Sequence, residues 1–159
     1  MNILVLCTGN SARSILLESI LGADPRIRSY SAGSKPTGRV NPASLRLLAQ
    51  RGIDTTPFKS KSWDVFTIDD APHMDVVITV CGNARDETCP YWPGSPLRAH
   101  WGVSDPADAI GSETEIDTAF ETAYDVLNER AQALLAQPIE TMAHTELQAF
   151  LNNVAGIGA

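Results

Sequence analysis

A cysteine and an arginine near the start of the chain have a spacing that suits oxyanion chemistry. Five residues separate Cys7 from Arg13 in the run Cys-Thr-Gly-Asn-Ser-Ala-Arg-Ser, residues 7–14. An apolar run at 2–6 predicts a buried strand before it, and a helical pattern follows from 12 to 21. Such a turn directs successive backbone N–H groups into one concavity, at the positive end of the helix dipole. The pattern predicts a loop that binds a tetrahedral oxyanion, with the Arg13 guanidinium contacting two of its oxygens.

The same loop should activate the thiol of Cys7. A cysteine at a helix N-terminus near a cation has a lowered pKa, so we expect a thiolate nucleophile. Ser14 is expected to donate a hydrogen bond to this thiolate. Gly9 is expected to supply a positive φ or a close backbone approach, and Asn10 to tie the loop by bonding its own backbone. The alternative is a buried cysteine beside an unrelated arginine, which the accompanying residues at these spacings disfavour.

Two further cysteines can extend this chemistry. Cys81 closes the segment 75–81, the strongest strand pattern in the chain, and Cys89 follows in a polar stretch. Because the carboxyl ends of parallel strands share one edge of a sheet, we expect Cys81 to lie on the same edge as Cys7. Three such thiols can pass oxidation outward by thiol–disulfide exchange. The alternative for Cys81 is an inert core cysteine, whereas an exposed thiol at Cys89 is harder to explain structurally.

The rest of the chain predicts strands that alternate with helices. Strands are expected at 2–6, 27–32, 75–81 and 97–101, and helices at 12–21, from Asn41-Pro42 to Gly52, from the capping box at 112–115 onward, and at 145–154. The segments 54–73 and 82–96 predict loops, the first with a helical turn near 63–66. This alternation indicates an α/β fold with a mainly parallel sheet.

The length and the net charge of the chain limit the classes of protein to which it can belong. With 159 residues the chain suits a main domain at 1–138 and a C-terminal helical extension at 139–159, packed on that domain or at an interface. The net charge of −7 argues against nucleic acid or an anionic membrane as a partner. Lys35 and Arg39 either guide anions inward or form ordinary solvated surface, and the second reading is favoured. The first residues do not resemble a signal peptide, and three cysteines suit a reducing compartment, so a cytoplasmic location is expected.

Several motifs resemble one enzyme family. Residues 7–14 resemble the phosphate loop of low-molecular-weight protein tyrosine phosphatases and, more closely, that of the thioredoxin-coupled arsenate reductases with the same fold. Further similarity lies in Val80-Cys81-Gly82-Asn83, Cys89-Pro90, His100-Trp101-Gly102 and Asp105-Pro106. The resemblance implies a single-domain three-layer sandwich around a four-stranded, mainly parallel sheet. A phosphatase of this fold carries Asp-Pro-Tyr at the acid position, whereas this chain has Asp105-Pro106-Ala107, which favours a small inorganic substrate.

The resemblance to arsenate reductases implies roles for these residues. Cys7 attacks arsenic, Cys81 and Cys89 resolve the product, and Asp105 acts as general acid. The oxyanion-binding set is Thr8, Gly9, Asn10, Ser11, Ala12, Arg13 and Ser14. The implied substrate is arsenate, with phosphate or sulfate as analogues. Thioredoxin, glutaredoxin or a low-molecular-weight thiol supplies the electrons in arsenic detoxification, no organic cofactor is implied, and residual phosphatase activity is compatible with the loop.

Two departures from the family pattern concern the loop. Ala12 stands where many relatives have a second loop cysteine, so the nucleophile has no thiol partner inside its own loop. Some relatives hold a structural potassium ion, and the matching positions here are Asn10, Glu18 and Ser31. No carboxylate stands clearly at the last ligand position near 60–62, so no metal site is expected.

Two other functions remain open. A tyrosine phosphatase would need Cys7, Arg13 and Asp105 but neither other cysteine, and its activity would survive loss of Cys81. A non-catalytic oxyanion-binding or redox-sensing module would bind arsenate or phosphate without turnover, even when a reductant is supplied.

Overall fold

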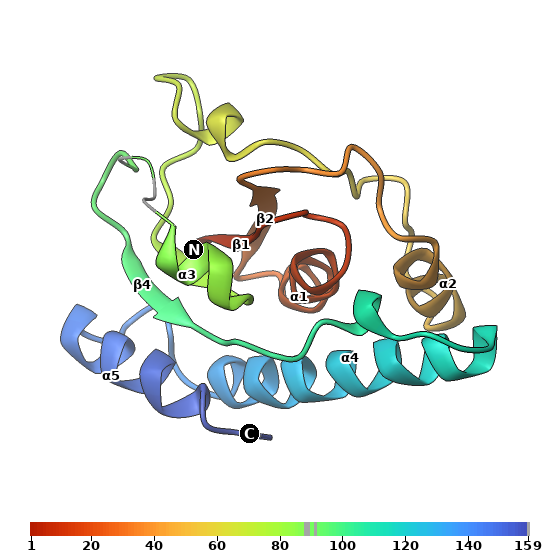
Figure 1. Ribbon diagram of the computed structural model, residues 1–159. Helices are drawn as coiled ribbons and strands as arrows, with labels where there is room; N and C mark the ends of the chain where they lie inside the picture. Colours follow the sequence, from red (N-terminus) through yellow and green to blue (C-terminus); the bar gives the residue numbers. More distant parts are fainter. Residues whose placement is uncertain (88–89, 91, 159) are drawn as a thin grey trace.

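Four parallel strands form the central sheet of the computed structural model, which describes residues 1–87, 90 and 92–158 (Figure 1). The strands are β1 (Asn2–Cys7), β2 (Arg28–Gly33), β3 (Val76–Thr79) and β4 (Leu97–His100), in the order β2-β1-β3-β4. Each neighbouring pair is parallel. All four carboxyl ends therefore meet at one edge, and the predicted α/β fold around a mainly parallel four-stranded sheet is confirmed.

Different elements pack on the two faces of the sheet. The elements on and around it are α1 (Arg13–Gly22), α2 (Pro42–Gln50), α4 (Glu113–Leu135), α5 (His144–Val154) and the 3-10 turn η1 (Trp63–Phe66). Ile3 and Val5 of β1 pack into the larger core, with the helices. Leu4 and Leu6 face a smaller core with Phe66 of η1. Because both faces are buried, β1 is apolar throughout instead of alternating. Figure 1 shows α4 and α5 along one side of the sheet and the loops on the opposite side.

Local capping explains where two helices begin. Asn41 caps α2 by accepting a hydrogen bond from the Ala43 N–H, with Pro42 at the first helical position. Ser112 and Glu115 form the capping box of α4, each side chain accepting from the other residue's backbone N–H. Both starts match the sequence prediction, because these caps depend only on neighbouring residues.

The prediction of a loop throughout 82–96 is wrong. A short helix, α3 (Gly82–Asp86), follows β3 directly, and the Cys81 sulfur caps it by accepting from the Ala84 N–H. Sequence patterns do not indicate this start, because cysteine is not among the usual N-cap residues and Gly82 ordinarily breaks helices. The strand before it is shorter than the predicted 75–81, since the ladder ends at Thr79.

The C-terminal helix α5 covers the edge strand β4. The Gln148 side-chain amide accepts from the Arg98 N–H at 3.3 Å and donates to the Arg98 carbonyl at 2.7 Å. The Trp101 indole donates to the Leu151 carbonyl at 2.9 Å. The division of the chain at 138 stays a prediction. Among the described residues, no helix has the length and apolar character needed to cross a bilayer.

Candidate active site

The segment between β1 and α1 is a loop with its carbonyl groups turned outward. The Thr8 carbonyl accepts from the Lys35 N–H at 3.0 Å, and the Gly9 carbonyl from the Thr37 N–H at 3.0 Å. Within the described part of the chain, the N–H groups of residues 9–13 donate to no hydrogen bond. The N-cap residue of α1 also offers no side-chain cap. Free N–H groups at a helix N-terminus form a concavity that suits an anion.

Asn10 holds this loop in shape. It is fully buried and has a positive φ of 46°. Its Nδ2 donates to Ser14 Oγ and Ser31 Oγ, both at 2.9 Å, and its Oδ1 accepts from the Lys61 N–H at 2.9 Å. The expectation for the Asn10 side chain is therefore wrong: it binds neighbouring segments instead of its own backbone, because its buried amide needs several partners. The positive φ lies at Asn10, whereas a Cβ at Gly9 would lie 3.3 Å from the Thr37 methyl group, so close packing is the reason that the structure gives for Gly9.

Gly33, at the end of β2, lets the sheet approach the loop closely. A Cβ at this position would lie 2.4 Å from the Thr8 carbonyl oxygen and 3.0 Å from that of Cys7. Side chains do not pack this close to backbone oxygens, so only glycine fits without moving the loop. Sequence reasoning missed Gly33, because the contact joins two segments that are distant along the chain.

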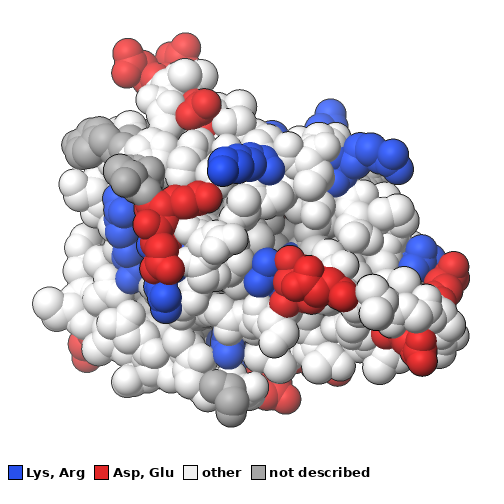
Figure 2. Space-filling view, viewed as in Figure 1, with Lys and Arg blue, Asp and Glu red and all other residues white. Residues whose placement is uncertain are grey.

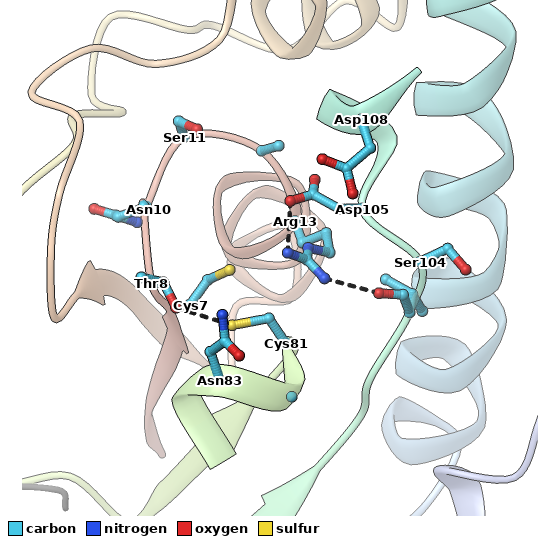
Figure 3. Close-up of a pocket in the computed structure, with 14 residues that line it drawn as sticks. Cys7, Thr8, Asn10, Ser11, Arg13, Cys81, Asn83, Ser104, Asp105 and Asp108 are labelled. Atoms are coloured by element: carbon cyan, nitrogen blue, oxygen red, sulfur yellow. Dashed lines mark hydrogen bonds and ion pairs between the residues drawn. The ribbon is translucent and has the colours of Figure 1, made fainter. Parts of the chain in front are cut away.

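The thiols of Cys7 and Cys81 are both buried and face each other in the site (Figure 3), and a hydrogen bond between them is the main cause of their pKa shifts. The bond to Cys81 and burial raise the pKa of Cys7, and the Arg13 charge offsets this only partly. The bond from Cys7, with those from Thr8 Oγ1 (3.5 Å) and the Ala84 N–H (3.4 Å), lowers the pKa of Cys81 to about 5. The lowered pKa expected for Cys7 is therefore wrong here. The pKa values of the two thiols are therefore shifted in opposite directions, upward for Cys7 and downward for Cys81.

Arg13 joins the oxyanion loop to the segment after β4. Its Nη2 donates to Asp105 Oδ2 at 2.7 Å, and its Nη1 to the Val103 carbonyl at 2.9 Å (Figure 3). Asp105 also caps the 3-10 turn η2 (Pro106–Asp108), where its Oδ1 accepts from the Ala107 N–H at 3.0 Å. The Nε of Arg13 is buried and has no partner among the described residues. The guanidinium is thus held in place through both Nη atoms, and its Nε–H is still available to a ligand.

These groups surround a cavity of about 440 Å³ at the carboxyl edge of the sheet. The structure brings Cys7, Cys81, Arg13 and Asp105 to its wall, together with residues 8–12. Figure 3 shows the two sulfur atoms, the guanidinium and the Asp105 carboxylate around one space. The nucleophile and the cation come from the two ends of the loop between β1 and α1, whereas the second thiol and the acid candidate come from two segments that are distant in sequence. Their roles are taken up under the proposed function.

Of the other predicted site residues, Ser14 does not lie where it was expected, and Cys89 is not among the described residues. Ser14 is fully buried beneath the loop, and among the described contacts none joins it to Cys7. Cys89 lies outside the described residues, so its part in the chemistry stays a prediction. The lining residues that the sequence analysis did not name are Val103, Ser104 and Asp108. Their nearness to Asp105 along the chain is the sequence signal for them.

The side chains suggested for a cation bond to one another. Ser31 Oγ donates to Glu18 and accepts from Asn10 Nδ2. Burial raises the pKa of Glu18, and the Ser31 hydroxyl and the charge of Lys61 act in the opposite direction. In the described part of the chain, no three His, Cys, Asp or Glu side chains group in a way that could hold a metal ion. In the structure, Glu18 and Ser31 hold the side chain of Asn10 in place.

Known proteins are similar to this chain in sequence over most of its length. Residues 2–145 match the family described as low molecular weight phosphotyrosine protein phosphatase. The arsenate reductase of Bacillus licheniformis is 39% identical over 129 residues, covering 79% of this chain and 88% of that protein. The arsenate reductase of Bacillus subtilis is 36% identical over 129 residues, with the same coverage of 79% and 88%.

Solved structures have the same fold. The arsenate reductase of Archaeoglobus fulgidus matches with a TM-score of 0.66 at 26% identity, over 85% of this chain and 99% of that chain. An arsenate reductase in a phosphate-binding state matches with a TM-score of 0.63 at 26% identity, over 85% of this chain and 96% of that chain. The chain therefore belongs to the low molecular weight phosphotyrosine protein phosphatase family.

Proposed function

We propose that this protein reduces arsenate to arsenite through a cascade of thiols. The observation that carries the proposal is the second thiol, Cys81, hydrogen-bonded to the nucleophile candidate Cys7 inside the oxyanion cavity. Phosphate ester hydrolysis has no use for a thiol there, whereas reduction requires one to form a disulfide. The related proteins from Bacillus, at 36–39% identity, are themselves arsenate reductases, which supports the same substrate.

Binding begins with arsenate in the oxyanion loop. The free N–H groups of residues 9–13 donate to its oxygens, and Arg13 contributes through its unpartnered Nε. Cys7 must then lose its proton. Cys81, which already accepts the hydrogen bond from Cys7, takes this proton, and the Cys7 thiolate forms beside the arginine and the loop.

The Cys7 thiolate attacks arsenic, and a bond forms between sulfur and arsenic. One arsenate oxygen leaves as water, and Asp105 is the general acid that passes a proton to it. Asp105 is positioned for this by Arg13 and by its place as the cap of η2. The absence of an aromatic residue after Pro106 leaves the cavity without a ring to flank an aryl ester, which suits an inorganic substrate.

Reduction occurs in the next step. Cys81 then releases its proton to solvent, and its thiolate, stabilised by bonds from Thr8 and the Ala84 N–H, attacks the sulfur of Cys7. The sulfur–arsenic bond breaks, its electron pair stays on arsenic, and arsenite leaves as a Cys7–Cys81 disulfide forms. We propose that Cys89 then attacks Cys81, frees Cys7 and leaves a Cys81–Cys89 disulfide. Thioredoxin, glutaredoxin or a small thiol reduces that bond, a cycle that suits the reducing cytoplasm.

The test is arsenite production with a thioredoxin system, compared with glutaredoxin and with a low-molecular-weight thiol alone. Hydrolysis of an aryl phosphate is measured in parallel. The proposal expects many arsenite turnovers with one of these donors, slow aryl phosphate hydrolysis, and loss of arsenite turnover in Cys81→Ser. If aryl phosphate is the better substrate and its hydrolysis is unchanged in Cys81→Ser, the protein is a phosphatase. Tight phosphate binding with neither activity would identify a binding module.

A further inference from the structure

The oxyanion cavity has little positive charge of its own. Its charged lining side chains are Arg13, Asp105 and Asp108, and Arg13 is paired with Asp105. The thiolate of the Cys7–Cys81 pair adds another negative charge, and the net charge of the whole chain is −7. A dianion such as arsenate therefore approaches a cavity whose ionised side chains, taken together, repel it.

Basic residues gather on the two loops beside this cavity. The chain has three lysines, Lys35, Lys59 and Lys61, and all of them lie between residues 35 and 61, together with Arg39. These positions lie on the loop after β2 and on the loop after α2. Figure 2 shows basic side chains on the upper part of the face that also carries the cavity, where these loops run in Figure 1.

Hydrogen bonds attach both loops to the oxyanion loop. The Lys35 N–H donates to the Thr8 carbonyl at 3.0 Å. From the second loop, the Ser60 hydroxyl donates to the Gly9 carbonyl at 3.1 Å, and the Gly38 N–H donates to that hydroxyl at 3.2 Å. The basic side chains are therefore carried on segments that are fixed to the loop expected to hold the anion.

Three of these cations are free to act on an approaching ion. The side chains of Lys35, Arg39 and Lys59 are exposed, and they form no hydrogen bond or ion pair with any described residue. Lys61 differs, because it is partly buried, donates to the Lys59 carbonyl at 3.1 Å and interacts with the charge of Glu18. We define the cationic rim as Lys35, Arg39 and Lys59.

We propose that the cationic rim draws inorganic oxyanions into the cavity against the negative field of the rest of the protein. The exposed charges of the rim act through water, and they attract a dianion about twice as strongly as a monoanion. The attraction weakens as salt shortens the Debye length, from about 30 Å at 0.01 M to about 3 Å at 1 M. The proposal rests on the proposed function only in naming arsenate as the anion, because the rim would attract phosphate equally.

The experiment measures the dissociation constant of inorganic phosphate by calorimetry at about 0.02 M and about 0.5 M salt. The rim variant is Lys35→Gln with Lys59→Gln. The matched control is Arg28→Gln with Arg98→Gln, which removes the same charge from exposed side chains without described partners. Arg28 begins β2, at the sheet edge opposite the cavity. Because neither rim side chain forms a hydrogen bond or ion pair with a described residue, the variants should remain folded.

We expect the rim variant to weaken phosphate binding about three- to tenfold at low salt and less than twofold at high salt. The control should change it less than twofold at either salt. The KM for arsenate should rise in parallel while kcat stays unchanged. Equal phosphate affinities for rim variant and control at low salt would overturn the proposal. If the rim effect appears with phosphate but wild-type protein reduces no arsenate, the proposed function fails and the rim stands.

Discussion

Arg13 donates to Asp105 at 2.7 Å, which joins the oxyanion loop to the segment that carries the candidate acid. Both side chains are largely shielded, with 12% of the arginine and 31% of the aspartate exposed. The cation expected to hold the substrate and the carboxylate expected to protonate the leaving oxygen are therefore partners before substrate arrives. We expect an oxyanion in the cavity to bind the Nε of this guanidinium and to share its charge with Asp105.

This pairing predicts opposite effects of Asp105→Asn on binding and on chemistry. The amide cannot donate a proton as an acid, so kcat for arsenate reduction should fall about 10²–10⁴-fold. Phosphate binding should stay equal or become tighter, because the loss of the carboxylate charge frees Arg13 for the anion. Steady-state kinetics and calorimetry measure the two effects. Asp108→Asn, in the same cavity but with no described bond to Arg13, is the control and should lower kcat less than tenfold. Equal losses in both variants would contradict the acid role.

Thr8 should control the reactivity of the second thiol. Its hydroxyl lies 3.5 Å from the Cys81 sulfur and helps to lower the pKa of Cys81 to about 5. Thr8→Val removes this bond at nearly constant volume, so the pH at which Cys81 becomes reactive should rise. The measurement is the pH profile of alkylation at Cys81, located by mass spectrometry. Thr8→Ser keeps a hydroxyl and should retain the wild-type profile, and coincident profiles for all three proteins would count against this contact.

The same thiol should make stability depend on pH. The pKa of Cys81 is about 5 in the folded protein against an ordinary 9.0, so between these values unfolding takes up a proton there. The free energy of unfolding, relative to Cys81→Ser, should therefore rise with pH in this window, and the gain is lost as the pH falls through 5. Urea unfolding under reducing conditions at about pH 6, 7 and 8 measures the difference. A difference that stays constant would show that Cys81 is not a folded-state thiolate.

Gly33 should be required for the loop and for the fold. In Gly33→Ala the new Cβ meets the Thr8 carbonyl at 2.4 Å, so the oxyanion loop or β2 must move. We expect a loss of about 1–3 kcal/mol in unfolding free energy, together with weaker phosphate binding. Gly156→Ala is the matched control, because a Cβ there meets its nearest atom at an ordinary 3.6 Å. Wild-type stability and phosphate affinity in Gly33→Ala would show that the close approach is not needed.

Features that depend on neighbouring residues can be predicted from this sequence. The order of strands and helices and the caps at Asn41 and Ser112 follow from local patterns, and the fold aligns the strand ends that bring Cys7 and Cys81 together. The helix α3 cannot be predicted in the same way, because its cap is a cysteine sulfur. The same holds for the raised pKa of Cys7, since a helix dipole and a cation suggest the opposite until the second thiol is placed beside it.

Contacts between segments that are distant along the chain also cannot be predicted from sequence patterns. The bond from Arg13 to Asp105 and the approach of Gly33 to Thr8 depend on how the sheet edge is assembled, and neither has a local pattern. Sequence patterns also cannot show that Lys35 pairs with no described residue. Basic surface residues are ordinarily solvated, and only their position relative to the cavity distinguishes them.

The most direct test of the central claim is a single-turnover assay without any external reductant. Fully reduced protein is mixed with excess arsenate, and arsenite is counted per protein chain. The wild-type protein should release about one equivalent of arsenite and lose a pair of free thiols, because electrons come only from its own cysteines. Cys81→Ser should release none, although Cys7, Arg13 and Asp105 are intact. Stoichiometric arsenite from Cys81→Ser would contradict the role of Cys81, and no arsenite from either protein would contradict reduction by the chain's own thiols.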